Sequence, residues 1–475
     1  HLQAKGRMKK LSFFHTPFCY GDEENARIYL VAVYQDEGGK MKMAVLKLIK
    51  NATVFDGKHA ELKQDQNIVL ENNLVKEITK QPVCEENFEE IIDAKGKVTI
   101  PGLTDAHIHI SHNQVNQGAD ETRVDEAAVR SVKIAERTLL KGFTTIRDAG
   151  GITYGLKKNI DNGFLDGPRI FPSNAYISQT CGHGDTRASR AARRLGNGFY
   201  TSPSLFEGYS VIADGVPEVL RAVREQLFLG ASQIKIMAGG GISSDYDPLD
   251  TVQFTFEEMK AAVDAAADYG TYVMAHLYTP ASMQRAVKAG VKSLEHTTLM
   301  DDETGRVIKN SGAFVMPGPQ AIRPLTEFGY PEDFKLEDLP PSQRNRMIKH
   351  LKVRTGSEKA TEVINKYELP IVYGTDAFGD PDWFEPKQLE DFKYFKKRFG
   401  SFKGLVAATG NVYELFKLTT YQNPYPEGKI GVLEEGAFAD LLIVEGNPVE
   451  DLDILADENN IKFVMKDAKI YKNQL

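Results

Sequence analysis

The sequence predicts an α/β protein in which a (β/α)8 or TIM barrel is joined to a small β domain formed by both ends of the chain. The 475 residues exceed the usual size of a single core, so one large and one smaller domain are expected. Strand-like runs alternate with helical patterns through the middle of the chain, which is typical of parallel α/β folds. The two flanks instead contain short apolar runs separated by turn residues.

The two flanks share a strand-rich pattern. Between residues 44 and 100, runs such as VLKLI and QNIVLENNLVKEI are broken by turn signals, and the pattern returns in GKIGVLEEGAFADLLIVEGNP and IKFVMKDAKIY. We therefore expect residues 43–100 and 426–475 to form one β domain. Residues 1–42 are interpreted as an N-terminal extension of uncertain order, because Met43 would be a natural domain start.

Residues 101–425 carry about eight strand-like runs, which favours a closed barrel over an open sheet. The runs are DAHIHI, FTTIRDAG, RIFPSNAYI, QIKIMAG, YVMAHLY, SLEHTT, AFVMPG and PIVYGTDA. Apolar residues at spacings of three and four predict helices over 121–141, 217–229, 256–269 and 280–289. Longer loops are predicted at 180–203, 239–253, 317–342 and 378–388, and in a barrel the loops that follow strands build the active site.

Composition narrows the range of partners. Apolar residues make up 41% and charged residues 26% of the chain, as in ordinary globular proteins. The net charge of -8, without a long basic run, argues against nucleic acid as a partner. No run has the length of a membrane helix, and the first residues lack the apolar centre of a signal peptide. Three widely spaced cysteines favour a reducing compartment, so we expect a cytoplasmic protein without a membrane partner.

Histidines at strand ends are the main chemical signal. His107 and His109 lie two residues apart on a predicted strand and therefore face the same side. The pair alone is equally consistent with one buried, hydrogen-bonded histidine and one exposed histidine. His276 in MAHLY and His296 in LEHTT lie in or at the end of two further predicted strands. Four of the ten histidines would thus converge on one rim, where they could bind metal.

Two further charged residues belong to the same predicted rim. Lys235 in QIKIMAGG would be expensive to bury without compensation. It would form either a salt bridge to an internal carboxylate or, after reaction with carbon dioxide, a carbamate that bridges two metal ions. Asp376 in IVYGTDAF ends a predicted strand, where an aspartate is often only a turn former or a helix cap. With the four histidines, these residues would form one site rich in oxygen and nitrogen.

The motifs PGLTDAHIH, KGFTTIRDAGG, IKIMAGGG, MAHLY, LEHTT and YGTDA occur in the order shown by the amidohydrolase superfamily, which the chain resembles from Met43 to its C-terminus. The segment GVLEEGAFADLLIVEGNP also resembles the C-terminal β-sandwich segment of these proteins. The resemblance implies a distorted (β/α)8 barrel over residues 101–425, a β-sandwich from the two flanks, and two divalent metal ions, usually zinc. One metal would bind His107, His109 and Asp376, the other would bind His276 and His296, and carboxylated Lys235 would bridge them.

The implied activity is hydrolysis of an amide C–N bond by a hydroxide held between the two metals. Asp376 would take the proton of this hydroxide and deliver it to the departing amine. The segments ISQTCGHGD, AGGGISSDYDPLD and AHLYTPASMQRAVKAGVKSLEH resemble a subgroup with Xaa-Pro dipeptidases, imidazolonepropionase and ochratoxin amidase. In that subgroup a loop histidine and a tyrosine contact the substrate, which implies His183 and Tyr278 here. We expect small-molecule amides as substrates, either dipeptides or N-acyl amino acids, and a homo-oligomer.

Several alternatives remain at the level of sequence. His183 could merely stabilise its loop, and Tyr278 could be a packed aromatic residue. Loop arginines that could bind a substrate carboxylate are Arg187, Arg190 and Arg323. A cyclic amide or amidine hydrolase, or a deaminase, would use much the same ligands, although mononuclear deaminases generally lack the bridging lysine. A non-catalytic binding module would be expected to have lost ligands, and all six are present.

Overall fold

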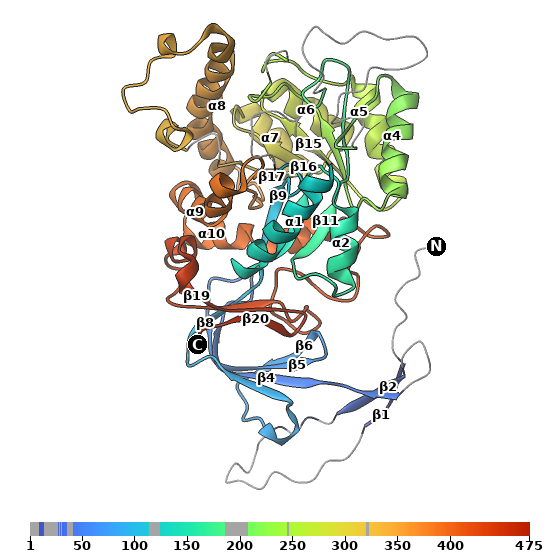
Figure 1. Cartoon of the computed structure of the whole chain (residues 1–475), viewed down its shortest axis with the longest axis vertical. Coiled ribbons are helices and arrows are strands. Elements are labelled where there is room, and N and C mark those ends of the chain that lie inside the picture. The colour runs from blue at the N-terminus through green and yellow to red at the C-terminus, as the bar shows by residue number, and fades with distance from the viewer. Residues whose placement is uncertain are drawn as a thin grey trace. The chain divides into compact units, whose positions relative to one another are not determined.

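The computed structural model describes residues 9–13, 27, 29, 31–35, 41–113, 124–185, 208–244, 247–319 and 323–475. The chain divides into two compact units, one with residues 1–102, 426–447 and 459–475 and the other with residues 103–425 and 448–458. Strands predominate in the smaller unit, whereas strands and helices alternate in the larger unit (Figure 1). The fold is therefore α/β.

The main sheet of the smaller unit combines strands from both ends of the chain. Its order is β20-β19-β18-β8-β4-β5-β6, with β7 paired to β4. The C-terminal strand β18 pairs antiparallel with the N-terminal strand β8, from Leu441↔Pro101 to Val444↔Val98. The strands are β4 (Leu46–Val54), β5 (Lys63–Glu71), β6 (Leu74–Thr79), β7 (Glu90–Asp93), β8 (Val98–Pro101), β18 (Leu441–Val444), β19 (Ile461–Lys466) and β20 (Lys469–Asn473).

A second, three-stranded sheet in the smaller unit has the order β1-β2-β3. Its strands are β1 (Lys9–Phe13), β2 (Ala32–Gln35) and β3 (Met41–Met43), so the predicted extension contributes β1, β2 and the first two residues of β3. Cys84, which precedes the 3-10 helix η1 (Glu85–Asn87), is disulfide-bonded, whereas Cys181 of the larger unit is a free thiol. The spacing of the cysteines did not predict that Cys84 would form a disulfide.

Seven of the eight strand-like runs predicted for the larger unit contain strands. They form two parallel sheets, with the orders β11-β10-β9 and β13-β12-β14-β15-β16-β17. The run RIFPSNAYI is divided into two strands, because Asn174 adopts a positive φ of 55° between them. The strands are β9 (Leu103–Ile108), β10 (Phe143–Asp148), β11 (Arg169–Pro172), β12 (Tyr176–Ser178), β13 (Ser210–Ile212), β14 (Ile234–Met237), β15 (Val273–Leu277), β16 (Ser293–His296) and β17 (Phe314–Met316).

The eighth run, PIVYGTDA, is not a regular strand. It forms single parallel bridges to β17 and to the end of β9, at Val315↔Ile371 and Ile108↔Ala377. Asp376 N also donates to His107 O at 2.7 Å. A Cβ atom on Gly374 would lie 2.8 Å from the Cβ atom of His107, so glycine permits this close approach. The segment therefore bonds to both sheets and brings Asp376 beside His107.

The helices of the larger unit are placed beside these strands (Figure 1). Those predicted from the sequence correspond to α1 (Val124–Leu140), α4 (Val216–Phe228), α5 (Phe256–Asp268) and α6 (Pro280–Ala289). Local signals define several ends, since Thr255 and Thr279 form capping boxes at the starts of α5 and α6. The others are α2 (Tyr154–Asp161), α7 (Asp302–Ser311), α8 (Pro341–Lys366), α9 (Pro381–Phe399), α10 (Ser401–Ala407) and α11 (Gly410–Phe416).

Two predicted loops are wrong in part. Residues 378–388 are not a loop throughout, because α9 begins at Pro381 with Asp380 accepting a bond from the backbone N–H of Asp382. Residues 317–342 contain two 3-10 helices, η3 (Leu325–Phe328) and η4 (Leu336–Asp338), and then the start of α8. Among the described residues, no helix is both long enough and apolar enough to cross a membrane.

Stacked aromatic rings fill the core between β10 and α9. The Tyr373 ring stacks on that of Phe392, with centroids 4.3 Å apart, and Phe143 lies 6.0 Å from Tyr373 on a nearly parallel plane. All three side chains are fully buried. Such close packing restricts movement of the strand and of the segment that carry these rings.

Candidate active site

One cavity of about 740 Å³ in the larger unit contains the predicted site residues. Its volume lies in the range of small-molecule sites. Residues from five strand ends, from the segment 370–377 and from the loop after β12 meet in it. The six predicted ligands and the two substrate contacts implied by the resemblance all line this cavity: His107, His109, His183, Lys235, His276, Tyr278, His296 and Asp376.

Asp376 lies close to both of the first two histidines. Its Oδ1 atom is 3.4 Å from His107 Nε2 and 3.5 Å from His109 Nε2. One ligand atom of each of the three residues falls within 4.8 Å of the others, so the three could hold one metal ion.

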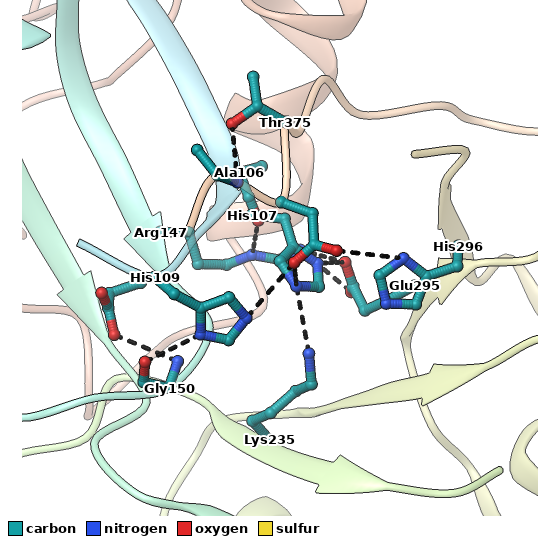
Figure 2. A network of polar contacts seen from close by, with 12 residues as sticks. Ala106, His107, His109, Arg147, Gly150, Lys235, Glu295, His296 and Thr375 are labelled. Atoms are coloured by element: carbon teal, nitrogen blue, oxygen red, sulfur yellow. Dashed lines mark hydrogen bonds and ion pairs between the residues drawn. The ribbon is translucent and has the colours of Figure 1, made fainter. Parts of the chain in front are cut away.

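The opposite ring nitrogens of both histidines are held by acceptors. His107 Nδ1 is 2.7 Å from Glu295 Oε2, and His109 Nδ1 is 2.9 Å from the Gly150 carbonyl oxygen (Figure 2). A carbonyl or an ionised carboxylate only accepts, so each Nδ1 carries the proton and each neutral ring directs the lone pair of Nε2 at Asp376. Burial holds the pKa of His107 well below its usual value, which favours this neutral form. Two ring nitrogens and a carboxylate oxygen thus converge on one space, where a metal cation could bind all three.

Lys235 reaches the same centre from β14. Its ammonium nitrogen is 3.2 Å from His107 Nε2, and its side chain is buried. Burial lowers the pKa of Lys235 to about 8. No carboxylate of the described residues lies within ion-pair distance of this nitrogen, so the salt bridge considered for Lys235 is not formed there.

His276 and His296 form the other side of the centre. Their ring centroids are 4.6 Å apart, and burial lowers the pKa of both, to about 4 for His296. The buried Nε2 atom of His276 has no hydrogen-bond partner among the described residues. An unpaired nitrogen of this kind is costly unless a ligand satisfies it. The residues therefore fit a metal centre, since neutral imidazoles, a carboxylate and an orphaned nitrogen face one space.

Backbone strain coincides with two of these residues. His296 has a φ of 72° and Asp376 a φ of 53°, in the left-handed region that non-glycine residues rarely adopt. The strained backbone directs both side chains into the same space, where His296 Nδ1 is 4.0 Å from Asp376 Oδ2. Strain of this kind is typical of functional sites.

Sequence reasoning missed a buried ion pair behind His107. Arg147 on β10 donates to both carboxylate oxygens of Glu295, at 3.1 and 3.2 Å, and both side chains are fully buried (Figure 2). Glu295 in turn orients His107. The signal was present, because an arginine in FTTIRD and a glutamate in SLEH interrupt strands that are otherwise suited to burial.

The substrate contacts implied by the resemblance also line the cavity. The Tyr278 ring stacks on His296 with centroids 5.1 Å apart, and burial raises the pKa of Tyr278 well above its usual value, so its hydroxyl stays protonated. His183 stacks on His276 with centroids 4.3 Å apart.

Of the arginines considered as carboxylate contacts, the described residues include Arg323, which does not line this cavity. Arg323 is buried and forms an ion pair with Asp391, so a substrate cannot reach its guanidinium. It is therefore not a substrate contact in this structure, and its part as a cationic anchor was predicted wrongly. Arg187 and Arg190 lie outside the described residues.

The outer wall of the cavity was not predicted at all. It is formed by η3 and the residue Tyr330 after it, by α8, and by Phe378, which follows Asp376 by two residues in the sequence. Most of its residues are apolar or aromatic, and α8 also contributes two polar ones: Leu325, Phe328, Tyr330, Gln343, Arg346, Met347, His350 and Phe378. The His350 and Phe328 rings meet edge to face at 5.2 Å. A largely polar helix far along the chain carries no local sign that it covers a site.

The chain is similar to proteins of known activity. Residues 98–471 match the family described as the amidohydrolase family. The chain is 32% identical to ochratoxinase from Aspergillus niger over 399 residues, which cover 79% of this chain and 76% of that protein. It resembles the crystal structure of a prolidase complexed with N-methylphosphonate-L-proline, with a TM-score of 0.79, 32% identity and coverage of 90% of this chain and 100% of the other. A Xaa-Pro dipeptidase with bound methionine has a TM-score of 0.75 at 29% identity, with the same coverages.

Proposed function

Because the chain belongs to the amidohydrolase family, we propose that it hydrolyses the amide bond of a dipeptide or an N-acyl amino acid at a centre of two divalent metal ions. The chain is a hydrolase; the substrate class and the metal dependence are the proposal. The observation that carries it is the convergence of His107 Nε2 and His109 Nε2 on Asp376 Oδ1, at 3.4 and 3.5 Å. This convergence supports the proposal, because ligand atoms at these distances could hold one metal ion.

The ligand set extends to both sides of Asp376. We propose zinc ions bound by His107, His109 and Asp376 on one side and by His276 and His296 on the other. Lys235 would bridge the ions as a carbamate, formed when its neutral amine adds to carbon dioxide and releases one proton. When bound, the two ions would polarise the substrate carbonyl and lower the pKa of water.

Side chains of the protein would carry out the proton transfers and hold the substrate. Asp376 would accept a proton from the attacking water on a carboxylate oxygen and deliver it to the departing amine nitrogen. The protonated hydroxyl of Tyr278 would donate to an acceptor of the substrate, and His183 would orient the substrate from the other side of the cavity. The apolar wall around Phe328 and Met347 would exclude water and accommodate a side chain of the substrate.

The proposal includes the arrangement of the strands. We propose that residues 101–425 form a distorted (β/α)8 barrel, in which the segment 370–377 takes the place of the eighth strand. The bridges from this segment to β17 and to the end of β9 support this arrangement. Residues 43–100 and 426–475 would form the β-sandwich.

Metal analysis and a substrate panel test the function. We expect the protein, purified with zinc and bicarbonate, to hold about two zinc ions per chain by mass spectrometry of the elements. Lys235→Ala would lower this content, whereas Lys352→Met, at an exposed ion pair, would not. The zinc-loaded enzyme would cleave members of a panel of dipeptides and N-acyl amino acids.

Two results would count against this function. A protein without transition metal, whose metal content is unaffected by Lys235→Ala, would contradict the metal centre. Turnover of cyclic amides or amidines without turnover of any linear amide would instead favour the cyclic-amide hydrolase or deaminase.

A further inference from the structure

We propose that Asp247 and Lys349 are positioning residues that hold the His183 imidazole in one tautomer and one orientation toward the cavity. The inference deepens the proposed function, because it rests on His183 as a substrate contact. It concerns the loop after β14 and helix α8, neither of which supplies a predicted metal ligand.

The Asp247 carboxylate is the centre of the arrangement. Its Oδ2 atom is 3.1 Å from His183 Nδ1 and accepts from Gly241 N at 2.8 Å and from Gln253 Nε2 at 3.4 Å. Only 1% of Asp247 is exposed, so this charge is almost completely removed from water. A buried carboxylate with several donors aimed at one oxygen has a fixed direction.

This direction determines the tautomer of His183. An ionised carboxylate only accepts hydrogen bonds, so His183 Nδ1 must donate to Asp247. In the neutral ring, Nε2 then carries the lone pair. The ring lines the cavity and stacks on His276, with centroids 4.3 Å apart and planes 15° apart. Asp247 therefore presents a defined acceptor nitrogen, rather than a mixture of two tautomers, to a substrate.

Lys349 holds the loop that carries Asp247. Its buried ammonium nitrogen on α8 donates to three carbonyl oxygens of the loop, those of Gly241 at 3.1 Å, Ser244 at 2.8 Å and Asp247 at 2.5 Å. It also lies 3.9 Å from Asp247 Oδ1, so its positive charge balances the carboxylate. A single cation thus ties α8 to the loop and compensates the buried negative charge.

The loop also approaches the His183 ring too closely for any side chain. A Cβ atom placed on Gly241 would lie 1.8 Å from His183 Cε1. The backbone N–H of His183 is held separately, by a 2.8 Å bond to Gln253 Oε1. The ring is therefore held by its own backbone, by the loop and by its stacking partner, and Asp247 decides which nitrogen carries the proton.

A double-mutant cycle tests the coupling. Asp247→Asn removes the charge with little change in size, so the preference of His183 for the tautomer with a protonated Nδ1 should weaken. We expect Asp247→Asn to lower kcat/KM of the zinc-loaded enzyme by about 100-fold, the scale of a misplaced reacting group. In a His183→Gln background, the same substitution should lower kcat/KM less than about 3-fold, because residues that act as a unit are not additive.

A matched control is available on the same loop and helix. Asp250 and Lys352 form an exposed ion pair at 2.6 and 2.8 Å, near in sequence to Asp247 and Lys349 but not bonded to His183. Asp250→Asn and Lys352→Met should each change kcat/KM less than about 2-fold, as expected for exposed pairs. Zinc content and thermal unfolding, measured on every variant, separate positioning from a general loss of fold.

A second readout does not depend on activity. In protein labelled with 15N-histidine, the His183 signals are those missing from His183→Gln. Wild type should show a protonated Nδ1 and an unprotonated Nε2, and Asp247→Asn should move these shifts toward the other tautomer. Lys349→Met should have the same effect to a smaller degree.

Several outcomes would overturn the inference. Multiplicative losses in the cycle, an unchanged kcat/KM in Asp247→Asn, or a His183 signal with Nε2 protonated in wild type would each contradict it. Absence of amide turnover in wild type would instead overturn the proposed function, and the 15N shifts would still decide whether Asp247 positions His183.

Discussion

Replacing Arg147 with methionine would leave the Glu295 carboxylate ionised in the interior without its cation. Arg147 is fully buried, and its guanidinium donates to Ala106 O at 2.5 Å, to Tyr272 Oη at 3.2 Å, to Ser293 Oγ at 3.0 Å and to both oxygens of Glu295. All five of its donors are thus satisfied within the protein. Glu295 is also fully buried and keeps only bonds from Ser293 Oγ at 2.6 Å and from His107 Nδ1 at 2.7 Å after the substitution.

The magnitude follows from this burial. Removing one partner of a fully buried pair leaves an uncompensated charge, which costs about 3–5 kcal/mol of unfolding free energy. Replacing both partners, in Arg147→Met with Glu295→Gln, removes both charges. We therefore expect the double variant to be about 2 kcal/mol more stable than Arg147→Met alone, because the penalty belongs to the unpaired charge.

Urea unfolding of the metal-free protein measures this difference. The chain has a single tryptophan, Trp383, which lies on α9 in the same unit as Arg147, so its fluorescence reports the relevant transition. Arg306→Met is the control, because Arg306 and Glu303 are each 57% exposed and their pair should contribute less than about 1 kcal/mol. The reasoning is refuted if Arg147→Met and Arg306→Met shift the transition equally, or if the double variant is less stable than either single variant.

For three further changes, the structure determines the direction of the expected effect on activity or stability. Gly241→Ala places a methyl group 1.8 Å from the His183 ring, so kcat should fall while zinc content stays unchanged, and an unaltered kcat would contradict the close approach. Removal of metal by a chelator should lower the thermal midpoint of the larger unit. The expected loss is equivalent to about 2.7 kcal/mol for an ion present at 100 times its Kd. Re-addition of zinc should restore the midpoint, and an unchanged midpoint would argue against a metal site in the native state. Asp56 is buried, and burial alone would raise its pKa. Its carboxylate accepts hydrogen bonds from the His59 side chain and from Lys58 N and His59 N, the last two at 2.9 Å. Together these hydrogen bonds outweigh burial and lower the pKa of Asp56 from 3.8 to about 2. Because a depressed pKa stabilises only the ionised form, wild type should be more stable than Asp56→Asn above pH 4, and the difference should vanish as pH falls to about 2; thermal unfolding between pH 2 and 6 would contradict this if the difference grew on acidification.

Local sequence was sufficient to predict most of the residues that meet at the candidate metal site. His107 and His109 share a face because strand residues alternate, and Lys235, His276 and His296 each lie within or at the end of a short buried strand that its own apolar pattern identifies. Parallel strands place such ends at one rim, so the residues could be brought together without knowledge of any long-range contact.

Other features depended on partners distant in the chain. The eighth strand-like run contains no regular strand, and its place between β17 and β9 depends on the close approach at Gly374 and on backbone hydrogen bonds to both strands. Arg323 had the same local character as any loop arginine, and only its burial against Asp391 excluded it from the substrate site. Charge in sequence does not reveal whether a side chain meets solvent, substrate or a buried partner.

The sequence by itself therefore determined the kinds of atoms at the centre and the family to which the chain belongs. Tertiary structure decided how these atoms are held. Glu295 and Arg147 are separated by 148 residues and Asp247 and Lys349 by 102, yet each pair orients a histidine at the same centre. Residue type and strand periodicity are local properties, whereas desolvation of a charge and the direction of its hydrogen bonds exist only after distant segments have packed together.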